Sequence, residues 1–143
     1  MIVHFVCEGN SFRSRLAETH LSSLKNPKIE AISSGIIARE NRIGPVSWYA
    51  QRLIQKNHLI PFEKITWTQT TAKNIIKGDL TVFMTQAIYD FCVKNYGFSS
   101  PKYEIWNIKD VLKDMDDSEK MDYTEKAFEE IKNKVADLVK KYA

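Results

Sequence analysis

The apolar positions of the chain switch repeatedly between a spacing typical of buried strands and one typical of helices. Ile2–Val6 is a continuous apolar and aromatic run, which predicts a strand covered on both faces. A helical spacing follows it, at Leu16, Ala17, His20, Leu21 and Leu24. We expect this first helix to end before Asn26 and Pro27, because the residue before a proline disfavours helical geometry.

The same alternation continues to the end of the chain. Three further strands are predicted from short runs, at Ile29–Ser33, Leu80–Met84 and Tyr103–Trp106. One long helix is predicted from Ile88, Phe91, Cys92 and Tyr96, ending at Gly97. The last helix is predicted from Phe128, Ile131, Val135, Leu138 and Tyr142. Strands that alternate with helices indicate a parallel sheet with right-handed crossovers and helices on both faces.

Three predictions concern element boundaries. Pro45 suits the first turn of a helix that continues through Ile54. A short helix is expected near Thr71–Ile76. Asp122, with Glu125 three residues later, is a variant of the capping box and predicts the start of the last helix.

Composition narrows the function classes. The 143 residues, 43% of them hydrophobic, suit a single domain over residues 1–143. The net charge of +3 comes from mixed charges, which argues against a nucleic-acid partner. No apolar run spans a membrane and the N-terminus is no signal peptide, so we expect a cytoplasmic protein. Two cysteines and three unclustered histidines predict no disulfide framework, metal or other cofactor.

The loop between the first strand and the first helix, Cys7–Ser14, is the first place to expect chemistry. Ligands of open parallel sheets bind outside the carboxyl ends of the strands. Backbone amides in a tight loop that enters a helix converge on an anion. Gly9 and Asn10 tolerate the left-handed backbone such a loop needs, and Arg13 can bind two phosphate oxygens at once.

Cys7 at the base of this loop is predicted to be a nucleophile. The thiolate is the reactive form of cysteine, and converging amides beside a guanidinium favour it. Ser14 could donate a hydrogen bond to that thiolate. The plainer alternative is a core cysteine followed by a helix that happens to begin near Arg13. Gly9, Asn10 and Ser14 together favour the phosphate cradle.

Cys7–Ser14, continued by Arg15–Glu18, resembles the signature of low-molecular-weight protein tyrosine phosphatases and of the related thioredoxin-coupled arsenate reductases. Further motifs follow in family order, at Ser33–Gly35, Gly44–Pro45, Asp79–Met84 and Trp106–Asp110. The resemblance covers most of the chain. It implies an α/β three-layer sandwich around a four-stranded parallel sheet in the order 2-1-3-4.

By this resemblance the chain is a cysteine-dependent phosphomonoesterase that acts on protein phosphotyrosine. Cys7 would form a phosphocysteine, and Arg13 would hold the equatorial oxygens. Asp110 would be the general acid, with Asp114 as the second candidate, and Ser33 would brace the loop. The implied substrate-binding positions are Glu8, Gly9, Asn10, Ser11, Phe12 and Ser14.

The chain also departs from the family pattern. Phe12 replaces a second cysteine, Arg15 replaces a proline and Val111 replaces the proline after the acid. Lys64 falls near a supporting histidine of many members. The aromatic candidates for a substrate groove are Trp48 and Tyr49.

Three alternative functions compete with the tyrosine phosphatase. An arsenate reductase needs two cysteines besides the nucleophile, and only Cys92 is present besides Cys7. A protein-arginine phosphatase is compatible with the small hydroxyl residue Ser11. A phosphate-loop protein that binds a phosphorylated partner without turnover is the third. The expected partners are a phosphorylated protein and phosphate or other oxyanions, with no nucleic acid and no membrane.

Overall fold

A four-stranded parallel sheet forms the centre of the computed structural model, which describes residues 1–143. Its strands are β1 (Ile2–Cys7), β2 (Glu30–Gly35), β3 (Leu80–Phe83) and β4 (Tyr103–Ile105). They lie in the order β2-β1-β3-β4, and every neighbouring pair is parallel. The predicted sheet and its order are confirmed, with strand bounds within two residues of those expected.

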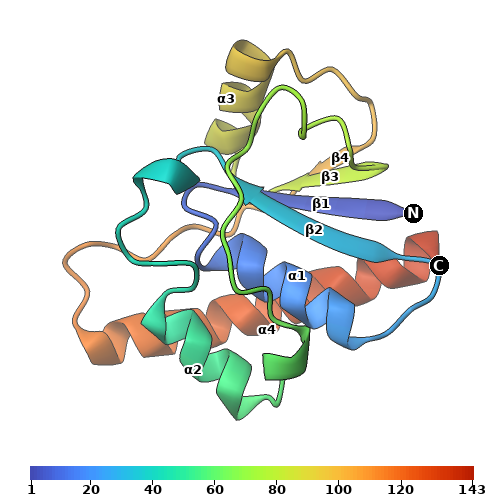
Figure 1. The fold of residues 1–143 in the computed structure, drawn as a ribbon. Coiled ribbons are helices and arrows are strands. Elements are labelled where there is room, and N and C mark those ends of the chain that lie inside the picture. Colours follow the sequence, from blue (N-terminus) through green and yellow to red (C-terminus); the bar gives the residue numbers. More distant parts are fainter.

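Helices cover both faces of this sheet. They are α1 (Arg13–Ser23), α2 (Trp48–Lys56), α3 (Gln86–Tyr96) and α4 (Asp117–Tyr142). Two short 3-10 turns, η1 (Ala38–Glu40) and η2 (Ile60–Phe62), lie in the connections. Figure 1 shows α1, α2 and α4 on one side of the sheet and α3 on the other. The predicted three-layer α/β fold is therefore confirmed.

β1 is the strand that positions the site. It lies between β2 and β3, and its residues 3–7 are buried because layers of helix cover both faces. Cys7 is its last residue and pairs with Gly35, the last residue of β2. The loop that follows Cys7 therefore leaves from the middle of the sheet at its carboxyl edge, where ligands bind in folds of this kind.

Pro45 does not begin a helix, contrary to the prediction. α2 begins at Trp48, and Ser47 before it is extended, with a ψ of 150°. The Ser47 amide donates to the Ser11 carbonyl over 2.8 Å, and its hydroxyl donates to the same oxygen over 3.1 Å. This attachment to the loop after β1 keeps Ser47 extended, so that the helix begins only at Trp48.

The helix expected over Thr71–Ile76 is absent, and the segment forms turns. The Asn74 carboxamide accepts from the Thr71 amide over 2.9 Å and donates to the Gln69 carbonyl over 2.8 Å. The Thr71 hydroxyl accepts from the Asn74 amide over 3.1 Å. Side-chain bonds of this kind compete with a helical ladder, which explains the wrong prediction.

The last helix begins earlier than predicted. Asp116, not Asp122, is its N-cap, and its carboxylate accepts from the Glu119 amide over 2.8 Å. The Glu119 side chain accepts in return from the Asp116 amide, which completes a capping box. The first turn of α4 is polar and exposed, so it carries no hydrophobic periodicity to reveal it. Asp122 and Glu125 are inside the helix.

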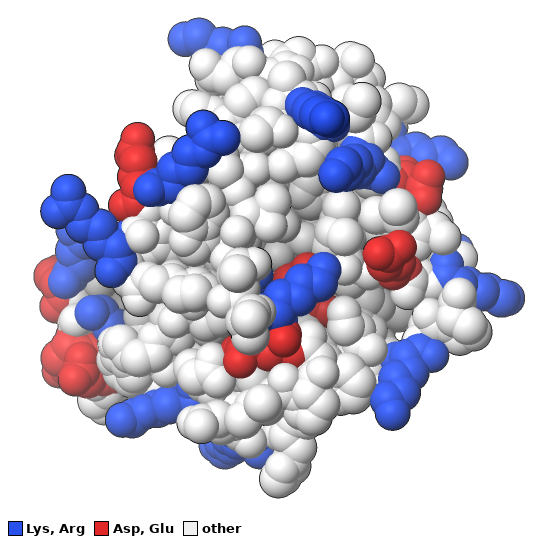
Figure 2. All heavy atoms as spheres, in the orientation of Figure 1, with Lys and Arg blue, Asp and Glu red and all other residues white.

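On the face that Figure 2 displays, no large patch carries charge of a single sign. Figure 2 shows basic and acidic side chains interspersed over the face it displays. None of the helices combines the length and the apolar character that crossing a membrane requires.

Candidate active site

The loop after β1 turns its carbonyl oxygens toward the protein. The Ile36 amide donates to the Cys7 carbonyl (3.0 Å), and the Ile37 amide donates to the Glu8 carbonyl (2.9 Å). The Asn41 carboxamide donates to the Gly9 carbonyl over 2.8 Å. In contrast, none of the backbone N–H groups of residues 8–13 donates to a protein acceptor. Six consecutive amides are therefore available to an anion beside Cys7.

Gly35 makes this loop conformation possible. A Cβ atom at Gly35 would lie 2.4 Å from the Glu8 carbonyl oxygen and 2.6 Å from the Asn10 nitrogen. No side chain fits there, because real Cβ contacts are longer. Sequence reasoning noted Gly35 only as the end of a motif, although a glycine ending the strand next to the loop is a signal that could have identified it.

Asn10 supplies the left-handed backbone predicted for the loop. Its φ is 53°, whereas Gly9 does not have a positive φ, so of the two residues that tolerate this conformation only Asn10 adopts it. The Asn10 oxygen accepts from the Thr68 amide over 2.8 Å, which fixes the orientation of the carboxamide. Its nitrogen then donates to the hydroxyls of Ser14 and Ser33, each over 2.9 Å. Asn10 therefore ties the loop to β2 and to the segment before β3.

A buried carboxylate ends one branch of this hydrogen-bond chain. Ser33 donates to Glu18 over 2.9 Å, because an ionised carboxylate only accepts. Ser14 accepts from Asn10, and its oxygen lies 2.9 Å from the Cys7 sulfur, so its hydroxyl proton is free to be donated to a Cys7 thiolate. The predicted contact between Ser14 and Cys7 is present. The side chains of Ser14 and Asn10 are fully buried and do not line the pocket, so these side chains hold the loop in shape.

Arg13 is buried at the rim, with 3% of its surface exposed. One guanidinium nitrogen donates to the Ile108 carbonyl over 2.8 Å, and the other lies 3.8 Å from the Asp110 carboxylate. The Arg13 Nε is buried and has no hydrogen-bond partner in the protein. The arginine is thus anchored at one nitrogen while its remaining donors stay available.

Asp110 and Asp114 were competing candidates for the acid. Asp110 lines the pocket, and its carboxylate is 45% exposed. Asp114 is exposed in the same loop but lines neither this pocket nor the groove beside it. The fold therefore brings Asp110 to Cys7 and Arg13, and leaves Asp114 outside.

The loop and the segment 37–43 enclose a pocket of about 530 Å³ with Cys7 in its lining. Cys7 itself is only 2% exposed. Tyr49 forms one wall and packs against the edge of Phe12, with ring centroids 5.3 Å apart. Burial raises the pKa of the Tyr49 hydroxyl, and the nearby Asp110 raises it further. Of the two aromatic candidates, Tyr49 lines this pocket and Trp48 does not.

A charged cluster that sequence reasoning missed supports the loop from behind. Arg15 is 2% exposed, and its guanidinium donates to the carbonyls of Thr66 (2.5 Å) and Lys64. Glu18 lies 3.9 Å from Arg15 and accepts from the Lys64 ammonium at 2.8 Å. Lys64 thus contacts the buried Glu18, near the place where a supporting residue was expected.

The second cysteine does not share this environment. Cys92 is buried on α3, and burial raises the pKa of its thiol to about 12. Cys7 and Cys92 are both free thiols.

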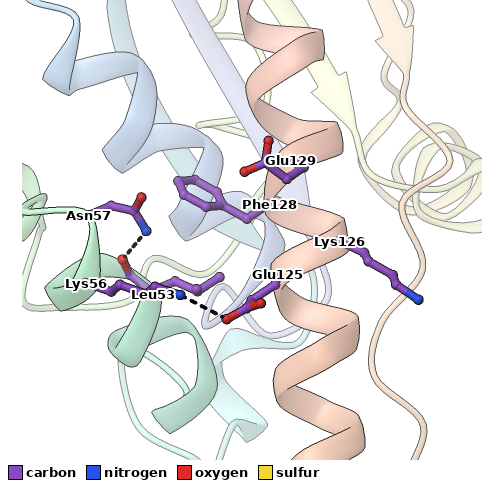
Figure 3. Close-up of a pocket in the computed structure, with 7 residues that line it drawn as sticks. All are labelled: Leu53, Lys56, Asn57, Glu125, Lys126, Phe128 and Glu129. Carbon is purple, nitrogen blue, oxygen red and sulfur yellow. Dashed lines mark hydrogen bonds and ion pairs between the residues drawn. The ribbon is translucent and has the colours of Figure 1, made fainter.

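Another hollow, of about 400 Å³, lies between α2 and α4 (Figure 3). The Lys56 ammonium is paired with Glu125 across it at 3.3 Å, and Asn57 donates to the Leu53 carbonyl over 2.8 Å. Phe128 packs at its floor between the helices. Several of its polar groups are already paired with each other and no reactive side chain lines it, so it is not a second candidate site.

Comparison with known proteins places this geometry in a family. The family model described as low molecular weight phosphotyrosine protein phosphatase matches residues 2–143. No curated protein sequence matches the chain.

Several solved structures share the fold. The YwlE arginine phosphatase with a phosphorylated active-site serine is 19% identical, with a TM-score of 0.81, and the match covers 99% of this chain and 95% of that one. Wzb from Vibrio vulnificus, in complex with benzylphosphonate, is 20% identical, with a TM-score of 0.81 over 98% and 97%. A low molecular weight protein tyrosine phosphatase from T. tengcongensis is 24% identical, with a TM-score of 0.77 over 99% of both chains.

These likenesses establish the fold, and the family model, which spans nearly the whole sequence, establishes the relationship. The chain belongs to the low molecular weight phosphotyrosine protein phosphatase family, whose members are hydrolases that act on phosphoric monoesters and bind phosphorylated substrates.

Proposed function

We propose that this phosphatase hydrolyses phosphotyrosine in proteins through a phosphocysteine formed on Cys7. The observation that carries the proposal is the run of six unpaired loop amides, residues 8–13, in the loop that begins at Cys7. Donors arranged in advance around a developing anion stabilise it without reorganisation. The Arg13 guanidinium adds a positive charge at the same rim.

In the first step the Cys7 thiolate attacks phosphorus as the bond to the tyrosine oxygen breaks. The loop amides and Arg13 hold the three non-bridging oxygens of the phosphoryl group. Asp110 gives its proton to the departing phenolate oxygen, so that neutral tyrosine leaves. The Ser14 hydroxyl, 2.9 Å from the sulfur, stabilises the thiolate before attack and again as a leaving group.

In the second step Asp110, now a carboxylate, takes a proton from water as the water oxygen attacks phosphorus. The bond between phosphorus and sulfur breaks, and the electron pair returns to Cys7 as thiolate. Inorganic phosphate leaves and the starting enzyme is restored. The position of Asp110 on the pocket wall, next to Arg13, supports its assignment over Asp114.

The walls of the pocket favour an aromatic leaving group. Tyr49 lines one side, and two exposed aliphatic residues, Ile37 and Ile43, line another. A phenyl ring between them would be in apolar surroundings, with its phosphate in the cradle. Three carboxylates also line the pocket, at Glu8, Glu40 and Asp110, and these would suit the guanidinium of phosphoarginine. Protein phosphoarginine is therefore the second candidate substrate.

An oxidoreductase function receives less support. A disulfide relay needs accessible thiols, and the only thiol besides Cys7 is the buried Cys92. We therefore propose that the enzyme does not reduce arsenate.

The test is turnover of p-nitrophenyl phosphate, phosphotyrosine and phosphoarginine by the purified protein, with release of inorganic phosphate as the readout. We expect hydrolysis of the two aryl phosphates and its loss in Cys7→Ser, which keeps the loop but has no thiolate. A Cys7→Ser protein that retains full activity would refute the mechanism. Faster hydrolysis of phosphoarginine than of phosphotyrosine would favour the second substrate.

A further inference from the structure

A second groove adjoins the phosphate-loop pocket, and the part of it that the pocket does not share has no role in the chemistry above. Its volume is about 500 Å³, and it lies between the segments 43–49 and 110–113. It is continuous with the pocket, because five residues line both: Glu8, Ile43, Tyr49, Asp110 and Lys113. Four residues line the groove alone: Trp48, Val111, Leu112 and Lys120.

The walls of this groove are unusually apolar for a surface. Leu112 is 60% exposed and Ile43 is 59% exposed, and Trp48, which lines the same groove, is partly exposed. Exposed apolar residues are ordinary when scattered, but several that line one groove mark a place where a ligand binds.

Unpaired positive charge lies in the same groove. Neither Lys113 nor Lys120 forms an ion pair with any carboxylate of the chain. Lys120 is half-buried on α4 and lines only the groove, whereas the carboxylates Glu8 and Asp110 belong to the part shared with the pocket. The groove therefore offers apolar walls and an unpaired ammonium outside the pocket.

Resting on the phosphatase function proposed above, we propose that this groove binds the polypeptide beside the phosphorylated residue and selects an aliphatic neighbour followed by an acidic one. The occupant is inferred from the connection between the two cavities. When the phosphate of a substrate lies against Cys7, the rest of the polypeptide must extend out of the pocket, where the groove begins. Leu112 and Trp48 would contact the aliphatic side chain, and Lys120 would pair with the carboxylate. Complementary charge of this kind contributes to specificity.

Four phosphotyrosine peptides test the proposal. The two residues adjacent to the phosphotyrosine are both leucine or both serine. The residues one position further out are both glutamate or both lysine. We expect leucine to raise kcat/KM over serine about tenfold, the low end for one apolar group entering a pocket, because the groove is open to water. The kcat/KM of the glutamate peptides should exceed that of the lysine peptides by about threefold, and this factor should decrease as salt is added.

Two variants assign these preferences to the groove. Leu112→Ser should abolish the leucine preference, and Lys120→Glu should abolish or reverse the glutamate preference. The matched controls are Leu24→Ser and Lys140→Glu, which change an exposed leucine and an exposed lysine outside the groove. All four proteins should hydrolyse p-nitrophenyl phosphate like the wild type, because this substrate is too small to extend from the shared pocket to Leu112 and Lys120.

The outcomes separate this inference from the function on which it rests. Equal kcat/KM for all four peptides, beside normal turnover of p-nitrophenyl phosphate, would overturn the groove and leave the phosphatase intact. No turnover at all would refute the function. In that case the affinities of the peptides for Cys7→Ser, measured by calorimetry, would still show the same preference if the groove assignment is right, and none if it is wrong. A dimer that Leu112→Ser dissociates would assign the groove to a second copy and overturn the proposal.

Discussion

Replacing Arg15 with methionine tests whether the charged cluster behind the loop holds the fold together. The change removes two charged hydrogen bonds, to the carbonyls of Thr66 and Lys64, and the buried partner of Glu18. Breaking a buried ion pair costs about 3–5 kcal/mol. Glu18 keeps Lys64 at 2.8 Å, and methionine fills much of the volume, so the low end applies. We expect the free energy of unfolding to fall by about 3 kcal/mol.

The measurement is urea denaturation of wild type and Arg15→Met, followed by far-UV circular dichroism. Arg39→Met is the matched control, because Arg39 is exposed and its side chain forms no ion pair. Its free energy of unfolding should change by less than about 0.5 kcal/mol. If Arg15→Met is as stable as this control, the buried guanidinium contributes nothing net and the reasoning fails.

The same variant has a consequence for catalysis. The segment that Arg15 holds includes Thr68, whose amide orients the Asn10 carboxamide. If that segment moves, Asn10 no longer holds Ser14 in place beside Cys7. For p-nitrophenyl phosphate, measured without urea, kcat should then fall by a larger factor than KM rises. An unchanged kcat in a destabilised but folded protein would show that the cluster serves stability alone.

Three further predictions concern single residues. Asp110→Asn should slow hydrolysis of phenyl phosphate by about 10²–10⁴-fold, the usual contribution of a general acid, whereas Asp114→Asn should be near neutral; the opposite result in steady-state kinetics would transfer the role. Gly35→Ala should lower kcat/KM by on the order of 10²-fold, since the new Cβ would displace the loop, and a normal rate would contradict the crowding found there. Burial lowers the pKa of His4 from 6.5 to about 4, so the unfolded chain takes up the proton first and stability falls as the pH drops through that window, by up to about 3 kcal/mol. The free energy of unfolding should therefore fall more between pH 7 and pH 4.5 in the wild type than in His4→Gln. The exposed His58→Gln should show the same fall as the wild type, and an equal fall in His4→Gln would disprove the assignment.

Local patterns were sufficient for most of the fold. The apolar run of Ile2–Val6 and the helical spacing after it are properties of neighbouring residues, and each element that they predicted is present. The predictions failed where a side chain bonds to the backbone in place of a regular ladder. Asn74 does this in the turn after Gln69, and the polar start of α4 at Asp116 is fixed by its cap and not by apolar residues.

The sequence alone predicted the site at the Cys7–Ser14 loop, because the proposed nucleophile, the arginine and the amides lie within eight consecutive residues between a strand and a helix. It could not locate the groups that hold the loop in shape. Gly35, Thr68 and Glu18 reach it from other parts of the chain, through contacts that no local spacing encodes. The resemblance to the family already favoured Asp110 over Asp114, but only the path of the chain after β4 places Asp110, and not Asp114, on the pocket wall. Residue type and spacing determined the chemistry available, and packing across the sheet edge decided which groups reach it.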